Sequence, residues 1–194
     1  MCKYSLDDLT YFTEHGMPRA AMLRAMQDLG IDEDAVYTLW ASDSARNRDV
    51  VRLYRDYGRD YGLQLERYID SVLAVRPIGQ DTRAGEPRYS LGELAWVHEV
   101  GMFRDDMARD LRTLSAPADV ARKVSHTAGA CGTIVQVWAA HGQHHGDLIR
   151  SYLGKVLSSY RPGWPHPAPP ARTEDRQDDV LGEREALREF TFSP

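Results

Sequence analysis

The fold is decided by residues 4–29, YSLDDLTYFTEHGMPRAAMLRAMQDL, because this stretch recurs at 89–114 as YSLGELAWVHEVGMFRDDMARDLRTL. The two stretches are identical at 11 of 26 positions. The similarity resumes further along the chain, where 53–73 aligns with 137–157. Repetition on this scale predicts a helical unit of about 84 residues that occurs twice. Two helical units in one chain usually bury a shared face, so we expect them to pack about a pseudo-two-fold axis.

The repeats also set the predicted boundaries along the chain. The first repeat covers 1–75, a linker rich in proline, glycine and arginine covers 76–88, and the second repeat covers 89–160. We expect the two repeats to pack together as one domain. The remaining segment, 161–194, begins with a Pro-rich stretch that cannot continue a helix. It goes on as an acidic tail whose last part, 180–192, is compatible with one short helix.

Local signals within each repeat predict an all-α fold. Ser5 with Asp8, and Ser90 with Glu93, have the spacing of a capping box, in which a serine and a carboxylate three residues later cap the start of a helix. Asp32 has the position of a cap for a later helix of the first repeat. Apolar residues recur at helical spacing throughout, and no stretch of comparable length alternates as a strand does.

Composition bounds the class of protein. The chain has 194 residues, 42% of them hydrophobic, which is enough for one or two packed cores. No stretch approaches the roughly 18 apolar residues that a membrane span requires, and the first residues lack the order of a signal peptide. Cys2 and Cys131 do not make a disulfide framework. We therefore expect a cytoplasmic protein with no membrane span. The net charge of −5, with both signs interleaved, argues against a broad nucleic-acid-binding surface.

Each repeat carries two glycines four residues apart within a helical pattern. They are Gly58 and Gly62 in the first repeat, and Gly142 and Gly146 in the second. An interior glycine costs a helix about 1 kcal/mol relative to alanine, so a recurring pair implies a structural reason. Glycines at i and i+4 share a face and let two helix backbones approach closely. We interpret these glycines as the place where the two long helices cross; the alternative is a kink or a helix end at each glycine.

Three histidines of the second repeat, His141, His144 and His145, replace two tyrosines and an aspartate of the first. His141 and His145 share a helix face at the spacing that lets two imidazoles hold one metal ion. Further candidate ligands, if the fold brings them near, are His98, His126 and Cys131. The pattern lacks the glutamates of zinc-protease and di-iron motifs. We therefore predict histidines that pack around the glycines and no bound cofactor; a metal or haem site is the alternative.

Residues 9–27, LTYFTEHGMPRAAMLRAMQ, resemble a bacterial helix-turn-helix motif, with a glycine at the turn and Pro-Arg opening the second helix. In such motifs the second helix enters the major groove of DNA, so the resemblance implies that Arg19 and Arg24 face the DNA. The second repeat keeps the arginines that match this pattern but adds three aspartates to the same helix. Carboxylates at that position repel phosphates, which disfavours a nucleic-acid partner.

The sequence contains no nucleophile–base constellation, phosphate-binding loop, dinucleotide fingerprint or zinc-finger spacing. We therefore predict a non-enzymatic, cytoplasmic helical repeat protein that acts through protein–protein interaction as an adaptor, regulatory or assembly component. The expected partner is another protein or a second copy of this chain. Two alternatives stay open: a metal- or haem-binding protein that uses the three clustered histidines, and a DNA-binding regulator that uses the hairpin around Gly16.

Overall fold

The computed structural model describes residues 3–42, 49–77 and 85–161. This part of the chain is all-helical, as predicted, with eight helices and no strand. The helices are α1 (Leu6–His15), α2 (Arg19–Asp28), α3 (Glu33–Ser42), α4 (Val50–Ala74), α5 (Leu91–Gly101), α6 (Arg104–Thr113), α7 (Ala118–Cys131) and α8 (Ile134–Leu157). The segment 162–194, with the short helix allowed by its sequence, lies outside the described residues, as does 78–84 of the linker.

Side-chain caps fix where several of these helices begin. The hydroxyl of Ser5 accepts from the backbone N–H of Asp8, and the Asp8 carboxylate accepts from the backbone N–H of Ser5, both at 3.0 Å. Ser90 and Glu93 make the same reciprocal pair at 3.2 and 2.7 Å. Asp32 accepts from two backbone N–H groups at the start of α3. These predicted caps are confirmed, and they satisfy donors that a helix start leaves unpaired.

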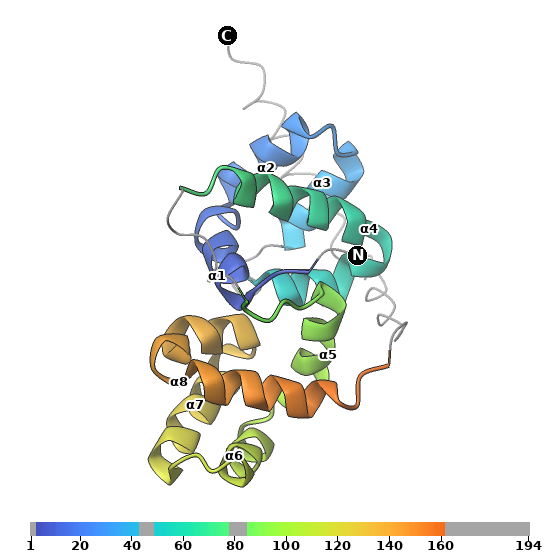
Figure 1. Ribbon diagram of the computed structural model, residues 1–194. Coiled ribbons are helices and arrows are strands. Elements are labelled where there is room, and N and C mark those ends of the chain that lie inside the picture. The colour runs from blue at the N-terminus through green and yellow to red at the C-terminus, as the bar shows by residue number, and fades with distance from the viewer. Residues whose placement is uncertain (1–2, 43–48, 78–84, 162–194) are drawn as a thin grey trace.

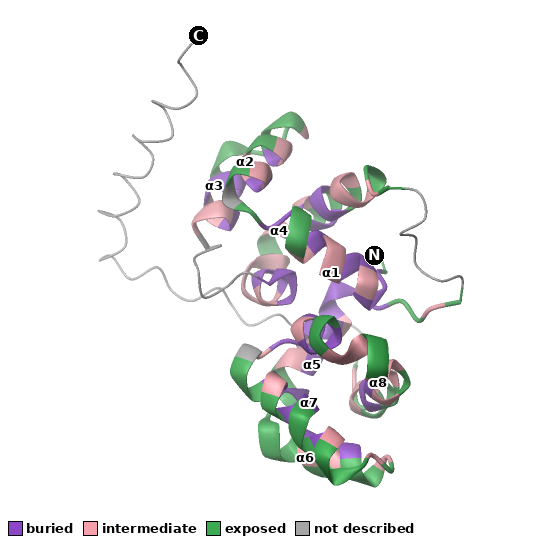
Figure 2. Cartoon of the chain, turned by 90° about the vertical axis from the view of Figure 1, so that its left-hand side faces the viewer, coloured by how far each residue is buried: buried purple, intermediate pink, exposed green. Residues whose placement is uncertain are grey.

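Four helices form the centre of the molecule. The shorter helices α1 and α5 each contact both long helices, α4 and α8, while the hairpins α2–α3 and α6–α7 lie at opposite ends (Figure 1). Tyr4 and Tyr89, just before α1 and α5, exchange two backbone hydrogen bonds of 2.8 Å. Buried side chains from both halves of the chain form one apolar cluster, on the faces where the central helices meet (Figure 2). Residues before and after the linker therefore share a core.

A tyrosine on each long helix reaches the end of the helix that opens the same half. The hydroxyl of Tyr68 donates to the carbonyl of Gly16 at 2.5 Å, and the hydroxyl of Tyr152 donates to the carbonyl of Gly101. Both tyrosines are buried. Burial, with a smaller contribution from nearby aspartates, raises the pKa of Tyr152 above its ordinary value, so its hydroxyl keeps the proton that it donates. Each bond satisfies a carbonyl that the end of α1 or α5 leaves without a helical partner.

We predict that Tyr68→Phe and Tyr152→Phe each lower the free energy of unfolding by about 1–3 kcal/mol, because a buried carbonyl loses its donor. Urea denaturation followed by circular dichroism measures the change. Tyr57→Phe is the matched control, since Tyr57 lies half-buried on α4 and a substitution of this kind usually changes stability by less than about 0.5 kcal/mol. Equal effects of all three substitutions would contradict a structural role for the two buried hydroxyls.

The structure corrects the interpretation of the paired glycines. A Cβ atom on Gly58 would lie 2.8 Å from the ring of Tyr54, and one on Gly142 would lie 2.7 Å from the ring of Trp138. The second glycines, Gly62 and Gly146, would each meet the same ring of their own helix at 3.1 Å. The nearest atoms therefore belong to an aromatic side chain of the same helix, not to the backbone of a crossing helix.

Both long helices also bend within the glycine-containing stretch. The backbone leaves helical geometry at Tyr61 in α4 (φ −127°, ψ 15°) and at His145 in α8 (φ −131°, ψ 25°). These two residues are aligned with each other in the repeated sequence. In each helix the bend lies directly before the second glycine. The kink, which the sequence offered only as the alternative, is present in both helices, and the predicted crossing does not account for their glycines.

The long helices contact each other at their N-terminal ends instead. Asp49 caps α4 and Thr133 caps α8, and the Thr133 hydroxyl donates to the Asp49 carboxylate at 2.5 Å. Both side chains are buried. Burial raises the pKa of Asp49, while the hydrogen bond from Thr133 opposes that shift. The buried Asp49 carboxylate thus caps the start of α4 and, through its hydrogen bond with Thr133, holds the start of α8 beside it.

We predict that Gly58→Ala and Gly142→Ala lower the free energy of unfolding, although helix propensity alone favours alanine by about 1 kcal/mol. The added methyl group would collide with a packed aromatic ring, and overpacking of this kind costs about 1–3 kcal/mol. Gly154→Ala is the control, because Gly154 lies in the same helix α8 and a Cβ there meets no atom within 4 Å. Stabilisation of Gly142→Ala equal to that of Gly154→Ala would contradict the ring-packing account.

Candidate functional site

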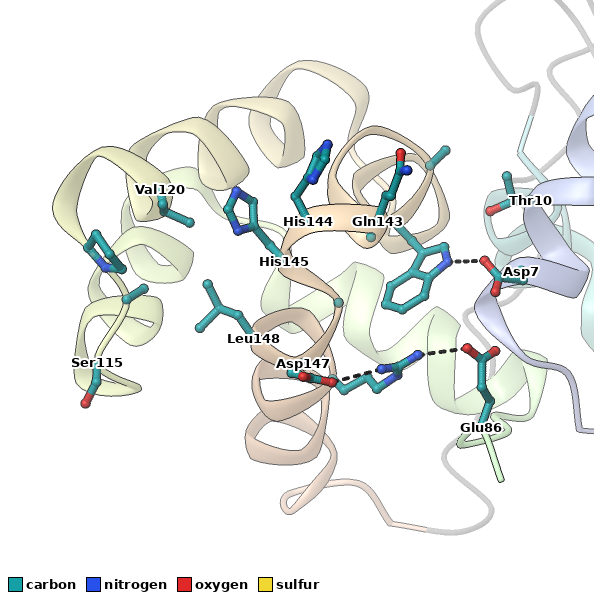
Figure 3. A pocket seen from close by; sticks show the side chains of 17 residues that line it. Asp7, Thr10, Glu86, Ser115, Val120, Gln143, His144, His145, Asp147 and Leu148 are labelled. Carbon is teal, nitrogen blue, oxygen red and sulfur yellow. Dashed lines mark hydrogen bonds and ion pairs between the residues drawn. The ribbon is translucent and has the colours of Figure 1, made fainter. Parts of the chain in front are cut away.

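A groove with a volume of about 790 Å³ lies beside the bend of α8, between that helix, the start of α7 and the outer face of α1 (Figure 3). The two ends of the groove differ in the chemistry of their side chains. Carboxylates, an indole and a guanidinium gather near α1 and the linker, whereas small and apolar side chains gather near α7. The groove is lined by Asp7, Thr10, Glu86, Ser115, Ala116, Pro117, Val120, Trp138, Ala139, Gly142, Gln143, His144, His145, Gly146, Asp147, Leu148 and Arg150.

The polar end is organised around Trp138. Its indole N–H donates to the carboxylate of Asp7 at 2.6 Å, which ties α8 to the first turn of α1. The guanidinium of Arg150 lies over the indole ring, 4.9 Å from its centroid, a favourable cation–π contact. Arg150 also donates to Glu86 at 2.9 Å and to Asp147 at 3.0 Å. One network therefore joins α1, the end of the linker and both sides of the bend in α8.

The bend places the predicted histidine cluster at the edge of this groove. His144 and His145 line it, with ring centroids 6.4 Å apart. His141 lies one turn earlier, 6.4 Å from His145, and its Nε2 atom is 2.8 Å from the hydroxyl of Thr127 on α7. Burial lowers the pKa of His141, and the nearby His145 and a lysine lower it further. The three histidines are thus neighbours on α8, as their spacing predicts.

The other candidate metal ligands are not assembled around them in the described part of the chain. There, no group of three or more histidine, cysteine, aspartate or glutamate side chains has an arrangement that could hold a metal ion. His126 lies exposed on α7, and the Cys131 side chain falls outside the described part. His98 is held at a different place, by contacts of its own. Among the described residues, His141, His144 and His145 do not form such a group either, so the metal or haem alternative stays a hypothesis from the sequence.

His98 lies between the two halves of the chain. The guanidinium of Arg55 on α4 donates to its Nε2 atom at 2.7 Å, so Nδ1 carries the proton and donates to the carbonyl of Gly132. Burial lowers the pKa of His98, and the positive charges of Arg55 and Arg52 lower it further. The hydrogen bond to Gly132 and the charge of Glu99 oppose this shift. A neutral imidazole that bridges α4 and the α7–α8 turn is a structural link.

The lowered pKa of His98 predicts how stability depends on pH. Its ordinary value is 6.5, so between that pH and the lower folded-state pKa the unfolded chain binds more protons than the folded chain. This contribution to the free energy of unfolding is complete above pH 6.5 and declines as the pH falls toward the folded-state pKa. His141 contributes in the same direction. Urea titrations at several pH values should show that, below pH 6.5, the free energy of unfolding of His98→Gln changes less with pH than that of the unmodified protein. An equal dependence on pH in both proteins would contradict this assignment.

The two arginines implied by the helix-turn-helix resemblance belong to α2, at the opposite end of the molecule from α6 and α7 (Figure 1), and no described residue of α2 lines the groove. Arg24 is exposed, and its Nε–H donates to the carbonyl of Ala20 in its own helix at 3.1 Å. Arg19 begins α2, and its side chain lies outside the described part of the structure. The groove and the candidate DNA-facing helix are therefore separate surfaces.

The residues that organise the groove were not among the candidates selected from the sequence. The signal lay in the divergence of the repeats: Trp138 replaces Tyr54, Arg150 replaces a glutamate, and Asp7 corresponds to a glycine. Each is an unremarkable surface or core residue by itself. They share one property: each differs from the residue at the aligned position of the other half, and all of them lie in the groove.

No protein-family model, curated protein or solved structure matches this chain. None of the helices in the described segments has the length and apolar character needed to cross a membrane. A function for this chain must therefore be inferred from its sequence and from the groove.

Proposed function

We propose that this protein is a non-enzymatic, duplicated helical protein that acts by binding another protein in the groove beside α8. The duplication is supported by 11 identities in 26 aligned residues and by features that occupy aligned positions in both halves. These are the capping boxes that start α1 and α5, the tyrosines that reach Gly16 and Gly101, and the bends of the long helices. A pseudo-two-fold relation between the halves is part of this proposal.

The position of the groove is the observation that carries the binding function. Its walls come from α1 of the first half and from α7 and α8 of the second, so neither half provides it alone. Clefts between packed units are favoured places for binding sites. Because this groove has both polar and apolar walls, it offers hydrogen bonds and apolar burial to one ligand, as protein interfaces do.

The polar groups of the groove act mainly in holding its shape. The Thr10 hydroxyl donates to a backbone carbonyl of α1 at 2.9 Å. The Arg150 guanidinium is shared between two carboxylates, and Asp7 accepts from Trp138. Neither hydroxyl residue of the described groove lining, Thr10 or Ser115, is hydrogen-bonded to a histidine or a carboxylate, which is the pairing that an activated nucleophile needs. The Thr127 hydroxyl that meets His141 lies outside this lining. This arrangement favours binding over catalysis.

A photo-crosslinking amino acid at position 143 tests the proposal in the full-length protein in its native host. Gln143 is exposed and lines the groove. We expect one defined protein to be attached there, and we expect excess unmodified protein to suppress the adduct by competition. The control carries the same amino acid at position 63, because Leu63 is 70% exposed on α4 and does not line the groove.

Several outcomes separate the proposal from its alternatives. Attachment of a second copy of this chain at position 143 would show that the partner is the same protein, in a homo-oligomer. Equal adducts at positions 143 and 63 would contradict a binding groove. Nucleic acid attached to the chain would favour the DNA-binding alternative. Stoichiometric zinc or iron in the purified protein that disappears when His141 and His145 are both changed to tyrosine would favour the metal alternative.

A further inference from the structure

The charges that line the groove are unbalanced. Three carboxylates, those of Asp7, Glu86 and Asp147, share the polar end with one guanidinium, that of Arg150. Arg150 pairs with Glu86 and Asp147. The Trp138 indole uses only one of the two carboxylate oxygens of Asp7. The acidic end therefore keeps unneutralised negative charge and acceptor capacity, which favour a cationic ligand.

The accessible acceptors are in the right place for a ligand. Asp147 is fully exposed, while the Glu86 carboxylate that shares Arg150 with it is only 10% exposed. An incoming cation can therefore approach Asp147 from solvent without breaking the part-buried Arg150–Glu86 pair. Because Arg150 already covers the Trp138 ring, we expect the ligand cation to be recognised by the carboxylates and not by the indole.

The opposite end of the groove is apolar. Ala116, Pro117 and Val120 come from the α6–α7 turn and the first turn of α7, and Leu148 faces them from α8, as Figure 3 shows for the labelled side chains. Val120 and Leu148 are only partly buried and pack against the main core. This wall can accept an apolar side chain of a ligand whose cation lies at the acidic end.

We propose that the groove binds a basic segment of a partner protein, in which a lysine or arginine lies close to an apolar residue. The cation binds at the exposed carboxylate of Asp147, and the apolar side chain packs against Val120 and Leu148 nearby (Figure 3). This inference rests on the proposed function, since it specifies the chemistry of the partner for the same groove. An acidic segment or a nucleic acid would meet like charge at Asp7, Glu86 and Asp147.

Fluorescence anisotropy with the full-length protein and three labelled peptides tests the proposal. The peptides are three repeats of Gly-Lys-Leu-Ser, of Gly-Glu-Leu-Ser and of Gly-Lys-Ser-Ser. We expect the Lys-Leu peptide to bind about fivefold more tightly than either of the others, a difference of about 1 kcal/mol. Equal or tighter binding of the Glu-Leu peptide would overturn the charge assignment, and equal binding of the Lys-Ser peptide would overturn the apolar contact.

Two charge reversals place the binding in the groove. Asp147→Lys should weaken binding of the Lys-Leu peptide about fivefold or more, because it places a cation where the ligand cation binds. Asp60→Lys is the matched control: Asp60 is exposed within α4, does not line the groove, and its reversal changes the net charge equally. An equal loss in both variants would mean that the peptide responds only to overall charge, and the proposal would be wrong.

Failure of this inference can be told from failure of the proposed function. A protein partner attached at position 143 together with no preference among the three peptides would leave the binding groove in place and reject the basic segment. If the Lys-Leu peptide binds only after Arg184 and Arg188 of the chain's own C-terminal segment are changed to serine, that segment is the occupant. The partner-protein proposal would then be overturned.

Discussion

The contact between the Trp138 ring and the two glycines of its own helix is the constraint on which the groove depends. A Cβ atom on Gly142 would lie 2.7 Å from the ring and collide with it, and one on Gly146 would make a tight contact at 3.1 Å. The indole can therefore lie along α8 as it does because Gly142 lacks a side chain, and Gly146 leaves it further room. The bend at His145 falls within the same stretch. The bend and the indole together determine where the polar end meets α1, because the indole N–H is then within hydrogen-bonding distance of Asp7. The site is thus built from a packing interaction internal to one helix.

The first half contains the same packing with different chemistry. Tyr54 lies over Gly58 and Gly62 as Trp138 lies over its glycines, and α4 bends at the aligned residue. A second contact also occurs at aligned positions of both halves with different side chains. The Arg76 guanidinium after α4 lies over the Tyr11 ring, 5.0 Å from its centroid, and the Tyr160 ring after α8 packs against Trp96. Both halves show this packing geometry with different side chains, and the groove lined by acids, an arginine and histidines lies where α8 of the second half meets α1 of the first.

Contacts between the halves hold these local features in a fixed relation. Thr133 and Asp49 share a buried hydrogen bond between the starts of the long helices, and His98 bridges Arg55 to the carbonyl of Gly132. A buried carboxylate such as Asp49 loses solvation and is tolerated because its acceptors are hydrogen-bonded. These polar contacts join elements that are distant in the sequence. The α1 wall of the groove is itself joined to α8 by the hydrogen bond between Trp138 and Asp7.

The sequence by itself determined the helical class, the starts of three helices and the neighbourhood of three histidines. Capping boxes, the Asp32 cap and i,i+4 spacing are local relations, set by residues within one or two turns of each other. The role of the glycines could not be decided in this way, because a glycine pair suits a helix crossing and an intrahelical aromatic contact equally well. Only the tertiary structure decided between them, and only it joined Trp138, Arg150, Asp7 and Glu86 into one groove. Trp138 and Asp7, which share a hydrogen bond, are separated by 131 positions in the chain. The packing of α1 against α8 brings them together, and no local sequence pattern encodes that packing.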